Sequence, residues 1–253
     1  MPKKTKIIAI TNQKGGVGKT TTSINLSASL ARVGKKVLMI DLDPQGNGTV
    51  GSGVNKTQFE ETIYEVLVDS LPLDKVMVEV EAGYQVVPSD GDLAGAQVEL
   101  LHEIGRELRL KNAISKIEKD FDFIFIDCPP ALNVLTINAM VASNSVIIPM
   151  QCEYFALEGL SSLVDTIKKI RDTLNPDLRI EGLLRTMFDS RNSLAGEVSD
   201  QLESYFGKKV YKTVIPRNVR LAEAPSYGQP ALLYDKSSKG ALAYLALAAE
   251  MVG

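Results

Sequence analysis

The segment from Thr11 to Thr22, TNQKGGVGKTTT, constrains the fold of this chain more than any other stretch. It follows a short apolar run and ends in Gly-Lys-Thr, as a phosphate-binding loop between a strand and a helix does. The usual pattern, G-x-x-x-x-G-K-[ST], requires a glycine where this chain has Gln13, and Lys14 stands beside it. The segment therefore predicts a strand–loop–helix unit that binds phosphate, and it leaves open whether Lys14 is an ordinary solvated lysine or has a role of its own.

Apolar runs without polar alternation are separated by helical patterns along the rest of the chain. Such runs are typical of strands covered on both faces, and this succession is typical of βαβ units. We expect central strands at 6–11, 36–41, 121–127 and 145–150, weaker strands at 84–88, 179–185 and 210–215, and helices at about 19–33, 92–119 and 157–174. Because no low-complexity linker interrupts the 253 residues, we predict a single α/β domain, 1–253, with a mostly parallel twisted sheet of about seven to eight strands flanked by helices.

Composition excludes several classes of protein. No run of about 18 apolar residues is present, and the apolar stretch Ile7 to Ile10 is too short for a signal peptide, so we expect a cytoplasmic protein. The cysteines, Cys128 and Cys152, form no C-x-x-C pair, and the single histidine, His102, gives little support to a histidine-based nucleophilic mechanism. The net charge of −3 argues against a wholly basic nucleic-acid binder but permits a local basic patch.

Two acidic strand ends complete a predicted nucleotide site. In the loop, Lys19 is placed to reach the β- and γ-phosphates, and Thr20 to place its hydroxyl on Mg²⁺. The buried run FDFIFID ends at Asp127, at the sheet edge where open α/β proteins bind ligands. The run KVLMID leads into DLDPQGN, in which Asp41 and Asp43 point the same way on an extended segment. Both carboxylates can then face the γ-phosphate and metal and orient the attacking water.

Several motifs resemble a known family. In order and spacing, KGGVGKTT, DLDPQGN and FIDCPP resemble the deviant Walker A ATPases of the ParA/MinD group, which have a P-loop NTPase fold. The stretches IPMQCEYFALEGL (148–160) and VIPRNVRLAEAPSYGQP (214–230) are similar to the chromosomal ParA branch, often called Soj. Because the loop begins at about residue 13, we expect no N-terminal helix-turn-helix domain of the kind found in larger plasmid ParA proteins. The resemblance implies ATP and Mg²⁺ as cofactors and a weak ATPase activity that a ParB-like centromere-binding partner stimulates.

The resemblance also assigns roles to individual residues. Lys14 matches the signature lysine, which crosses to the ATP of the partner subunit in a nucleotide-sandwich homodimer. Such a cation stabilises the phosphoryl-transfer transition state as an arginine finger does. Gly15 lies where a side chain would clash between subunits. The implied catalytic residues are Lys14, Lys19 and Asp43; the implied metal ligands are Thr20, Asp43 and Asp127; and the implied ATP-binding residues are Lys14, Gly15, Gly16, Val17, Gly18, Lys19, Thr20, Thr21, Met187 and Pro216.

A basic stretch near the C-terminus predicts a DNA-binding face. Residues 205–222 contain five basic residues and no acid, and such a stretch binds phosphates without reading bases. The resemblance associates this stretch and an earlier loop with nonspecific double-stranded DNA binding by the ATP dimer, and implies nucleoid association during chromosome or plasmid segregation. The predicted DNA-binding residues are Arg185, Arg191, Lys208, Lys209, Lys212, Arg217 and Arg220. The plainer alternative is an ordinary solvated basic surface.

Two other functions found in the wider group are alternatives to a DNA-binding partition ATPase. A MinD-like membrane-associated ATPase for division-site placement requires an amphipathic C-terminal helix with basic residues. After Lys239 this chain has no Lys or Arg, so we expect its tail to pack on the protein body and predict no membrane partner. Iron–sulfur cluster work requires cluster-ligating cysteines, whereas Cys128 and Cys152 are expected to be small buried residues.

Overall fold

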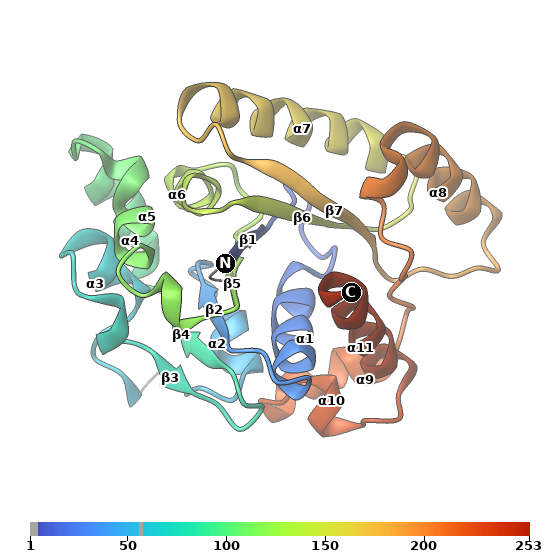
Figure 1. The fold of residues 1–253 in the computed structure, drawn as a ribbon, viewed down its shortest axis with the longest axis horizontal. Helices are drawn as coiled ribbons and strands as arrows, with labels where there is room; N and C mark the ends of the chain where they lie inside the picture. The colour runs from blue at the N-terminus through green and yellow to red at the C-terminus, as the bar shows by residue number, and fades with distance from the viewer. Residues whose placement is uncertain (1–4, 56–57) are drawn as a thin grey trace.

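A mostly parallel sheet of seven strands lies at the centre of the computed structural model, which describes residues 5–55 and 58–253 (Figure 1). The strand order is β3-β4-β2-β5-β1-β6-β7, and only the β3–β4 pair is antiparallel. The strands are β1 (Lys6–Ile10), β2 (Val37–Asp41), β3 (Val78–Glu79), β4 (Gln85–Val87), β5 (Phe123–Asp127), β6 (Ser145–Met150) and β7 (Arg179–Arg185). The predicted α/β fold class with a mostly parallel sheet is confirmed.

Helices cover both faces of this sheet (Figure 1). One face is covered by α1 (Lys19–Arg32), α9 (Val219–Glu223), α10 (Ala231–Tyr234) and α11 (Lys239–Val252). The other is covered by α3 (Ile63–Val68), α4 (Leu93–Glu99), α5 (Arg109–Ile114), α6 (Val134–Ala142), α7 (Ala156–Thr173) and α8 (Ser193–Phe206). Helix α2 (Asn47–Gly51) follows β2, and short 3₁₀ helices are η2 (Leu73–Lys75), η3 (Leu100–His102), η4 (Arg106–Leu108), η5 (Glu118–Asp120), η6 (Gly207–Lys209) and η7 (Ala224–Tyr227).

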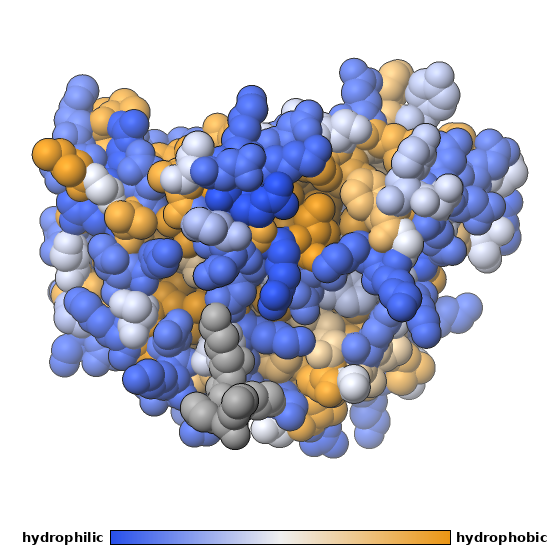
Figure 2. Space-filling view, turned by 45° about the horizontal axis from the view of Figure 1, so that its top comes forward, coloured by the Kyte–Doolittle hydropathy of each residue, from blue (hydrophilic) through white to orange (hydrophobic). Residues whose placement is uncertain are grey.

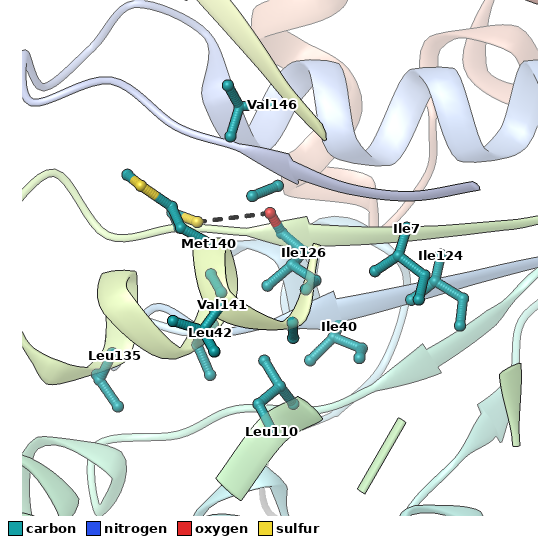
Figure 3. Packing of buried hydrophobic residues seen from close by; sticks show 14 of the residues in the cluster. Ile7, Ile40, Leu42, Leu110, Ile124, Ile126, Leu135, Met140, Val141 and Val146 are labelled. Atoms are coloured by element: carbon teal, nitrogen blue, oxygen red, sulfur yellow. Dashed lines mark hydrogen bonds between the residues drawn. The ribbon is translucent and has the colours of Figure 1, made fainter. Parts of the chain in front are cut away.

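The central strands are apolar throughout because their alternate side chains enter two separate hydrophobic cores. In β1, Ile7 belongs to the core beneath α3–α8, and Ile8 belongs to the core beneath α1 and α9–α11. Figure 3 shows the first of these cores, in which Ile126 of β5 packs with Met140 and Val141 of α6. Burial of one such side chain contributes about 1.5–3 kcal/mol. The continuous apolar runs therefore reflect strands covered on both faces, as predicted.

The prediction of a single long helix at 92–119 is wrong. The structure has α4, η3, η4, α5 and η5 there, with irregular residues between them. The backbone is extended at Glu103 and left-handed at Gly105, whose φ is 72°. Glycine adopts that conformation readily, and an α-helix cannot pass through it. The helical periodicity of the region is real, but it belongs to several short pieces.

The strand expected at 210–215 forms only in part. Isolated parallel bridges join Leu183 to Val210 and Phe188 to Pro216. Between the bridges, the backbone N–H groups of Lys212 and Thr213 donate to the Glu250 side chain instead of to a strand. A continuous ladder therefore does not form beyond β7.

Candidate functional site

The carboxyl ends of three adjacent strands meet at one edge of the sheet. Asp127, the last residue of β5, lies in register with Ile10 of β1 on one side and with Asp41 of β2 on the other. The loop after β1 and the acidic segment after β2 consequently converge on Asp127. Open α/β sheets bind their ligands at this edge.

The loop after β1 leaves the start of a helix open to an anion. Gly16 and Gly18 have φ values of 72° and 85°, a left-handed conformation that favours glycine. Gly18 is the N-cap of α1, and no side chain caps that helix end. The carbonyl of Val17 accepts a 2.8 Å hydrogen bond from the Thr186 hydroxyl, which anchors the loop to the end of β7. The free N–H groups and the helix dipole together favour a phosphate at this point.

The cavity at this edge has the size and lining expected of a nucleotide site. It has a volume of about 610 Å³, and its lining includes the predicted residues Gly15, Gly16, Gly18, Lys19, Thr20, Thr21, Asp43 and Met187. A smaller, mainly apolar pocket of about 200 Å³ shares Gly18, Thr21 and Met187 with it and adds Pro216. Among the predicted nucleotide-binding residues, Val17 and Lys14 line neither space.

Lys19 is a buried cation beside that cavity. Only 7% of the residue is exposed, and its Nζ donates to the Lys14 carbonyl at 3.2 Å. Burial lowers the pKa of Lys19, while the charge of nearby Asp127 acts in the opposite direction. A phosphate in the cavity would compensate this charge.

Asp127 lies beneath the cavity with one oxygen unpaired. The residue is fully buried, its Oδ1 accepts from the Ser23 hydroxyl at 2.9 Å, and its Oδ2 has no hydrogen-bond partner among the described residues. Burial, aided by the charge of Asp41, raises the pKa of Asp127. A buried carboxylate oxygen without a partner is costly, so this one is suited to receive a cation or its water shell.

Asp41 and Asp43 are separated by the fold, which corrects the expectation that both face the cavity. Both hydrogen bonds from Thr49, one from its N–H and one from its hydroxyl, reach Asp41 Oδ2 at 2.7 Å, and Asp41 is fully buried. Its carboxylate therefore fixes the turn into α2. Asp43 is half-buried, lines the cavity and accepts from the Gln45 N–H at 3.0 Å. The pairing of i and i+2 residues fails here because the strand ends at Asp41.

Lys14 lies outside the cavity, at the surface. Its side chain is 50% exposed, and its Nζ forms a 2.5 Å ion pair with Glu153. Its backbone N–H donates to the Asn12 side chain at 3.0 Å. The structure thus places Lys14 and Lys19, both from one loop, in opposite environments.

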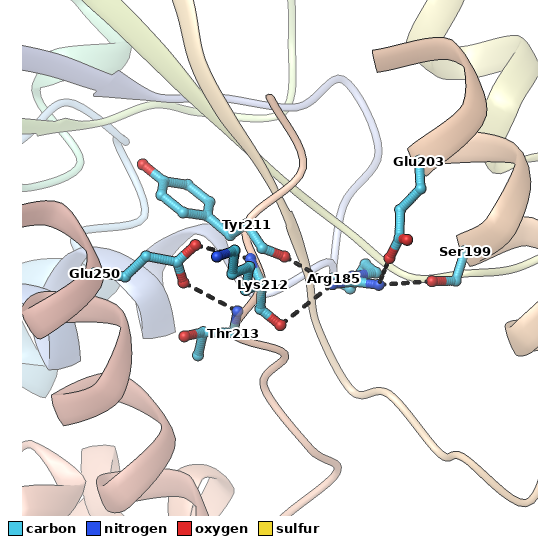
Figure 4. A network of polar contacts seen from close by, with 7 residues as sticks. All are labelled: Arg185, Ser199, Glu203, Tyr211, Lys212, Thr213 and Glu250. Carbon is cyan, nitrogen blue, oxygen red and sulfur yellow. Dashed lines mark hydrogen bonds and ion pairs between the residues drawn. The ribbon is translucent and has the colours of Figure 1, made fainter. Parts of the chain in front are cut away.

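The predicted basic face is less uniform than the sequence suggests. Lys208, Lys209, Lys212, Arg217 and Arg220 are exposed, as is Arg191. Lys209 donates to the Ile180 carbonyl, Arg191 pairs with Asp189, and Arg220 pairs with Glu223 and Asp235. Arg185 is the exception: it is 6% exposed, and its guanidinium bonds to Ser199, Glu203 and two backbone carbonyls (Figure 4). The prediction that Arg185 lies on the DNA-binding face is therefore corrected.

Other residues of the site carry no sequence signal of their own. Gln151 donates to the sulfur of Met187 at 2.6 Å, and Pro225 and Ser226 line the larger cavity. Met187 has a φ of 48°, which is strained for a residue other than glycine and marks the wall shared by the two spaces. In this site, the left-handed backbone of the loop glycines is the feature that a local sequence pattern could predict.

The remaining sequence expectations concern the cysteines and the tail. Cys128 and Cys152 are both buried and unpaired, as expected. Helix α11 buries Tyr244, Leu247 and Met251 in the core, so the tail packs on the body as predicted. None of the helices in the described part of the chain is both long and apolar enough to traverse a membrane.

Comparisons with known proteins agree with this geometry. A family model described as an AAA domain matches residues 5–180. The chain is 55% identical to the sporulation initiation inhibitor protein Soj of Bacillus subtilis, over 97% of this chain and 98% of that protein. It is 51% identical to the chromosome partitioning protein ParA of Myxococcus xanthus, over 98% of this chain and 88% of that protein.

A solved structure with the same fold has been determined with a nucleotide. It is the cobyrinic acid a,c-diamide synthase of Mycobacterium smegmatis with a bound ATP analogue and magnesium, at a TM-score of 0.86 and 37% identity. The similarity covers 98% of this chain and 94% of that one. Together with the family match and the two relatives, it shows that the chain belongs to the ParA/Soj family of chromosome-partitioning ATPases.

Proposed function

We propose that this chain is an ATP-controlled partition switch. Mg-ATP drives a nucleotide-sandwich homodimer, the dimer binds double-stranded DNA without reading its sequence, and hydrolysis stimulated by a ParB-like partner resets it. The observation that carries the proposal is the contrast between two lysines of one loop. Lys19 is buried and lines the cavity, whereas Lys14 is half exposed and pairs with Glu153 outside it. One lysine suits this chain's own nucleotide, and the other suits the nucleotide of a neighbour.

Several features of the cavity support the binding of ATP with Mg²⁺. The α1 N-terminus and Lys19 favour the phosphates, and Met187 and Pro216 offer apolar contacts to the base. Thr20 lines the cavity, and the unpaired Asp127 Oδ2 fits a hydrated cation. In the described residues, no group of three or more His, Cys, Asp or Glu is arranged to hold a metal ion. We therefore infer that the ion enters with the nucleotide, whose phosphates complete its coordination.

Asp43 is the carboxylate that we assign to hydrolysis. It lines the cavity and is held by the Gln45 N–H, so its position is fixed before a nucleotide arrives. A carboxylate at this point can orient the attacking water, and Mg²⁺ held with the nucleotide would supply positive charge beside the γ-phosphate. Asp127 and Asp41 are fully buried and do not take this role.

The surface beside Lys14 supports association with a second copy of the chain. A Cβ added at Gly15 would meet nothing within 4 Å, and the φ of Gly15 lies outside the left-handed region, so no contact in the described part of the chain requires glycine there. Tyr154 and Phe155 follow Glu153 directly, are 74% and 72% exposed, and pack edge to face. Figure 2 shows that hydrophobic residues gather between hydrophilic ones on one face of the molecule. Close approach of a partner would explain both the glycine and the exposed aromatic pair.

DNA binding is assigned to the exposed basic residues that remain after Arg185 is removed from the set. Lys208, Lys212 and Arg217 are exposed, whereas Arg191 and Arg220 are engaged with acids that DNA phosphates would have to displace. Each phosphate contact releases counterions, so affinity should fall steeply as salt rises. Dimerisation doubles the number of such contacts on one surface and raises the affinity through bivalency. Binding of this kind would associate the protein with the nucleoid.

A MinD-like membrane role is disfavoured by the packing of the C-terminal helix. The apolar face of α11 is already used against α1 and the sheet, through Tyr244, Leu247 and Met251. A helix that lies on a membrane must offer such a face to lipid, with basic residues at its edges.

The proposal is tested by measuring DNA binding at rising salt, with ATP, with ADP and without nucleotide. Wild type should bind only with ATP, with an affinity that falls steeply with salt. Lys14→Ala should bind weakly with every nucleotide because its dimer lacks both cross-subunit lysines and is less stable. Arg220→Glu should dimerise normally but bind DNA weakly. Binding that does not depend on nucleotide, or that Arg220→Glu leaves untouched, would overturn the proposal.

A further inference from the structure

The segment of residues 210–216, called here the bridging segment, joins two functional regions. It runs beside β7, with the Tyr211 N–H donating to the Leu183 carbonyl at 3.1 Å and the Ile215 N–H donating to the Arg185 carbonyl at 2.9 Å. At its start it follows the lysines of η6 and carries Lys212 itself. At its end, Ile215 and Pro216 form part of the wall of the apolar nucleotide pocket. Any change in its position would therefore reach both regions.

Arg185 fixes one edge of this segment (Figure 4). Its Nη2 donates to the carbonyls of Tyr211 and Lys212 at 2.7 and 3.3 Å. Its Nη1 donates to the Ser199 hydroxyl at 2.7 Å and to Glu203 at 2.6 Å, both on α8. A planar guanidinium can hold two carbonyls on one side and two acceptors on the other, which a lysine cannot do.

Glu250 of α11 fixes the opposite edge. It accepts from the N–H groups of Lys212 and Thr213 at 2.8 and 3.0 Å (Figure 4). The peptide groups between residues 211 and 213 are thus held by a cation at their carbonyls and by an anion at their amides. The Tyr211 ring also packs against Gly182, where any Cβ would clash with it. These contacts leave the bridging segment little freedom to slide along β7.

The strand that bears Arg185 leads directly into the nucleotide site. The next residue, Thr186, donates to the Val17 carbonyl of the phosphate-binding loop, and Met187 lines both parts of the cavity. The loop, the end of β7 and the bridging segment are therefore connected through three consecutive residues. A nucleotide that presses on Met187 or Pro216 acts on the same short stretch that Arg185 anchors.

We propose that Arg185 is a positioning residue, which holds the bridging segment in the register that links the nucleotide pocket to the basic surface of Lys208, Lys209 and Lys212. This inference rests on the proposed function, because it assumes that those lysines bind DNA in response to ATP. We expect Arg185 to make no DNA contact of its own, since it is only 6% exposed and both of its Nη groups bond inside the protein. An ion pair between a buried arginine and a half-exposed glutamate adds little net stability, but such a contact can specify one arrangement over others.

The experiment compares substitutions at three arginine positions. Arg185→Met removes the network, Arg191→Ala removes an exposed arginine of the predicted DNA face, and Arg179→Ala removes an exposed arginine at the other end of β7. For each, DNA affinity is measured with and without ATP across a range of salt concentrations. Arg179→Ala should match wild type in every measurement.

The two functional substitutions should differ in kind. Arg185→Met should lower the ratio of DNA affinity with ATP to that without ATP by about tenfold, as expected when a coupling between sites is lost. Its salt slope should stay that of wild type, because no phosphate contact is removed. Arg191→Ala should lower the salt slope by about one and leave nucleotide affinity unchanged. Arg185→Lys, which can keep one of the two carbonyl bonds, should recover part of the ratio.

Glu250→Gln provides an independent route if Arg185→Met does not fold. It weakens the other edge of the bridging segment and should also lower the ATP dependence of DNA binding without changing the salt slope. If Arg185→Met or Glu250→Gln keeps the wild-type ratio, or if Arg185→Met changes the slope as Arg191→Ala does, the positioning role is overturned. If wild type itself fails to bind DNA with ATP, the proposed function is overturned instead.

Discussion

The loop after β1 has two halves that differ in how far folding completes them. In one half, Gly18 caps α1, the Val17 carbonyl is anchored by Thr186, and Lys19 is buried beside Asp127. In the other half, Lys14 and Gly15 are exposed, and a surface ion pair with Glu153 is the main contact of the Lys14 side chain. The difference supports the proposal that a partner subunit completes the exposed half, which a single chain leaves open to solvent.

The largest expected effect is on ATP hydrolysis, after substitution of Lys14 in the exposed half of the loop. Lys14→Ala should lower partner-stimulated ATP hydrolysis by about a thousandfold, by analogy with the loss of an arginine finger. Asp43→Ala should be similarly inactive. Mixed in equal amounts, the two variants should recover about a quarter of the wild-type rate, because half of the dimers are mixed and each has one complete site.

A double variant is the control for this mixing experiment. Lys14→Ala mixed with Lys14→Ala/Asp43→Ala contains no Lys14 and should recover nothing in the same phosphate-release assay. If the first mixture also recovers nothing while mixed dimers form, Lys14 does not act across the interface.

The second prediction concerns nucleotide affinity after substitution of Lys19 in the buried half of the loop. Lys19→Ala should weaken ADP binding to the monomer by about 10- to 100-fold, because a charged hydrogen bond to phosphate is lost from a buried site. Lys14→Ala should leave the same affinity within about twofold, since its side chain lies outside the cavity. Titration calorimetry with ADP measures this without dimerisation. Equal losses for both variants would contradict the contrast between the halves.

The third prediction concerns the loss of stability that results from burying the Asp127 carboxylate. Burial raises the pKa of Asp127 in the folded state, so the folded protein holds this proton more tightly than the unfolded chain. The contribution of Asp127 to the free energy of unfolding is then most favourable below the unfolded pKa of about 4, and it falls as pH rises toward the folded pKa. Asp127→Asn carries no charge and should flatten this fall, stabilising the protein without nucleotide by roughly 1–3 kcal/mol above neutral pH.

Chemical denaturation at a series of pH values measures this effect. Asp43→Asn serves as the control. Because Asp43 is only half-buried, the free energy of unfolding of this variant should stay within about 0.5 kcal/mol of wild type. Asp127→Asn should at the same time lose Mg²⁺-dependent hydrolysis. A variant that is less stable than wild type at every pH would show that the carboxylate is not strained by burial.

The sequence predicted the buried half well because its signals are local. The helix expected at about 19–33 is Lys19–Arg32, the strand expected at 179–185 is Arg179–Arg185, and Asp127 ends β5 as expected. Glycine conformations and the parallel register then place these parts at one edge. Each of these features depends on a few neighbouring residues, which a sequence pattern records.

Arg185 and the region 92–119 show where such patterns stop. An arginine is usually exposed, and nothing near Arg185 in sequence announces that Glu203 and the Tyr211 carbonyl, 18 and 26 residues away, will enclose it. The periodicity of 92–119 predicts helix but does not reveal that Gly105 adopts a left-handed conformation. The long-range partners of Arg185 leave no local signal, and a glycine such as Gly105 permits a break in a helical pattern without requiring one.

The smallest expected effect is on dimerisation, after removal of the charge that pairs with Lys14 in the exposed half. Glu153→Gln removes the charge that pairs with Lys14, an interaction between two half-exposed side chains that contributes about 0.2–1 kcal/mol. If Glu153 holds Lys14 away from a partner, the variant should dimerise with ATP about two- to threefold more readily. Analytical ultracentrifugation with a slowly hydrolysed ATP analogue measures this, and Glu158→Gln on α7 is the matched exposed control. Weaker dimerisation of Glu153→Gln would instead mean that Glu153 supports Lys14 within the dimer, because loss of the charge then removes a contact that the assembled state keeps.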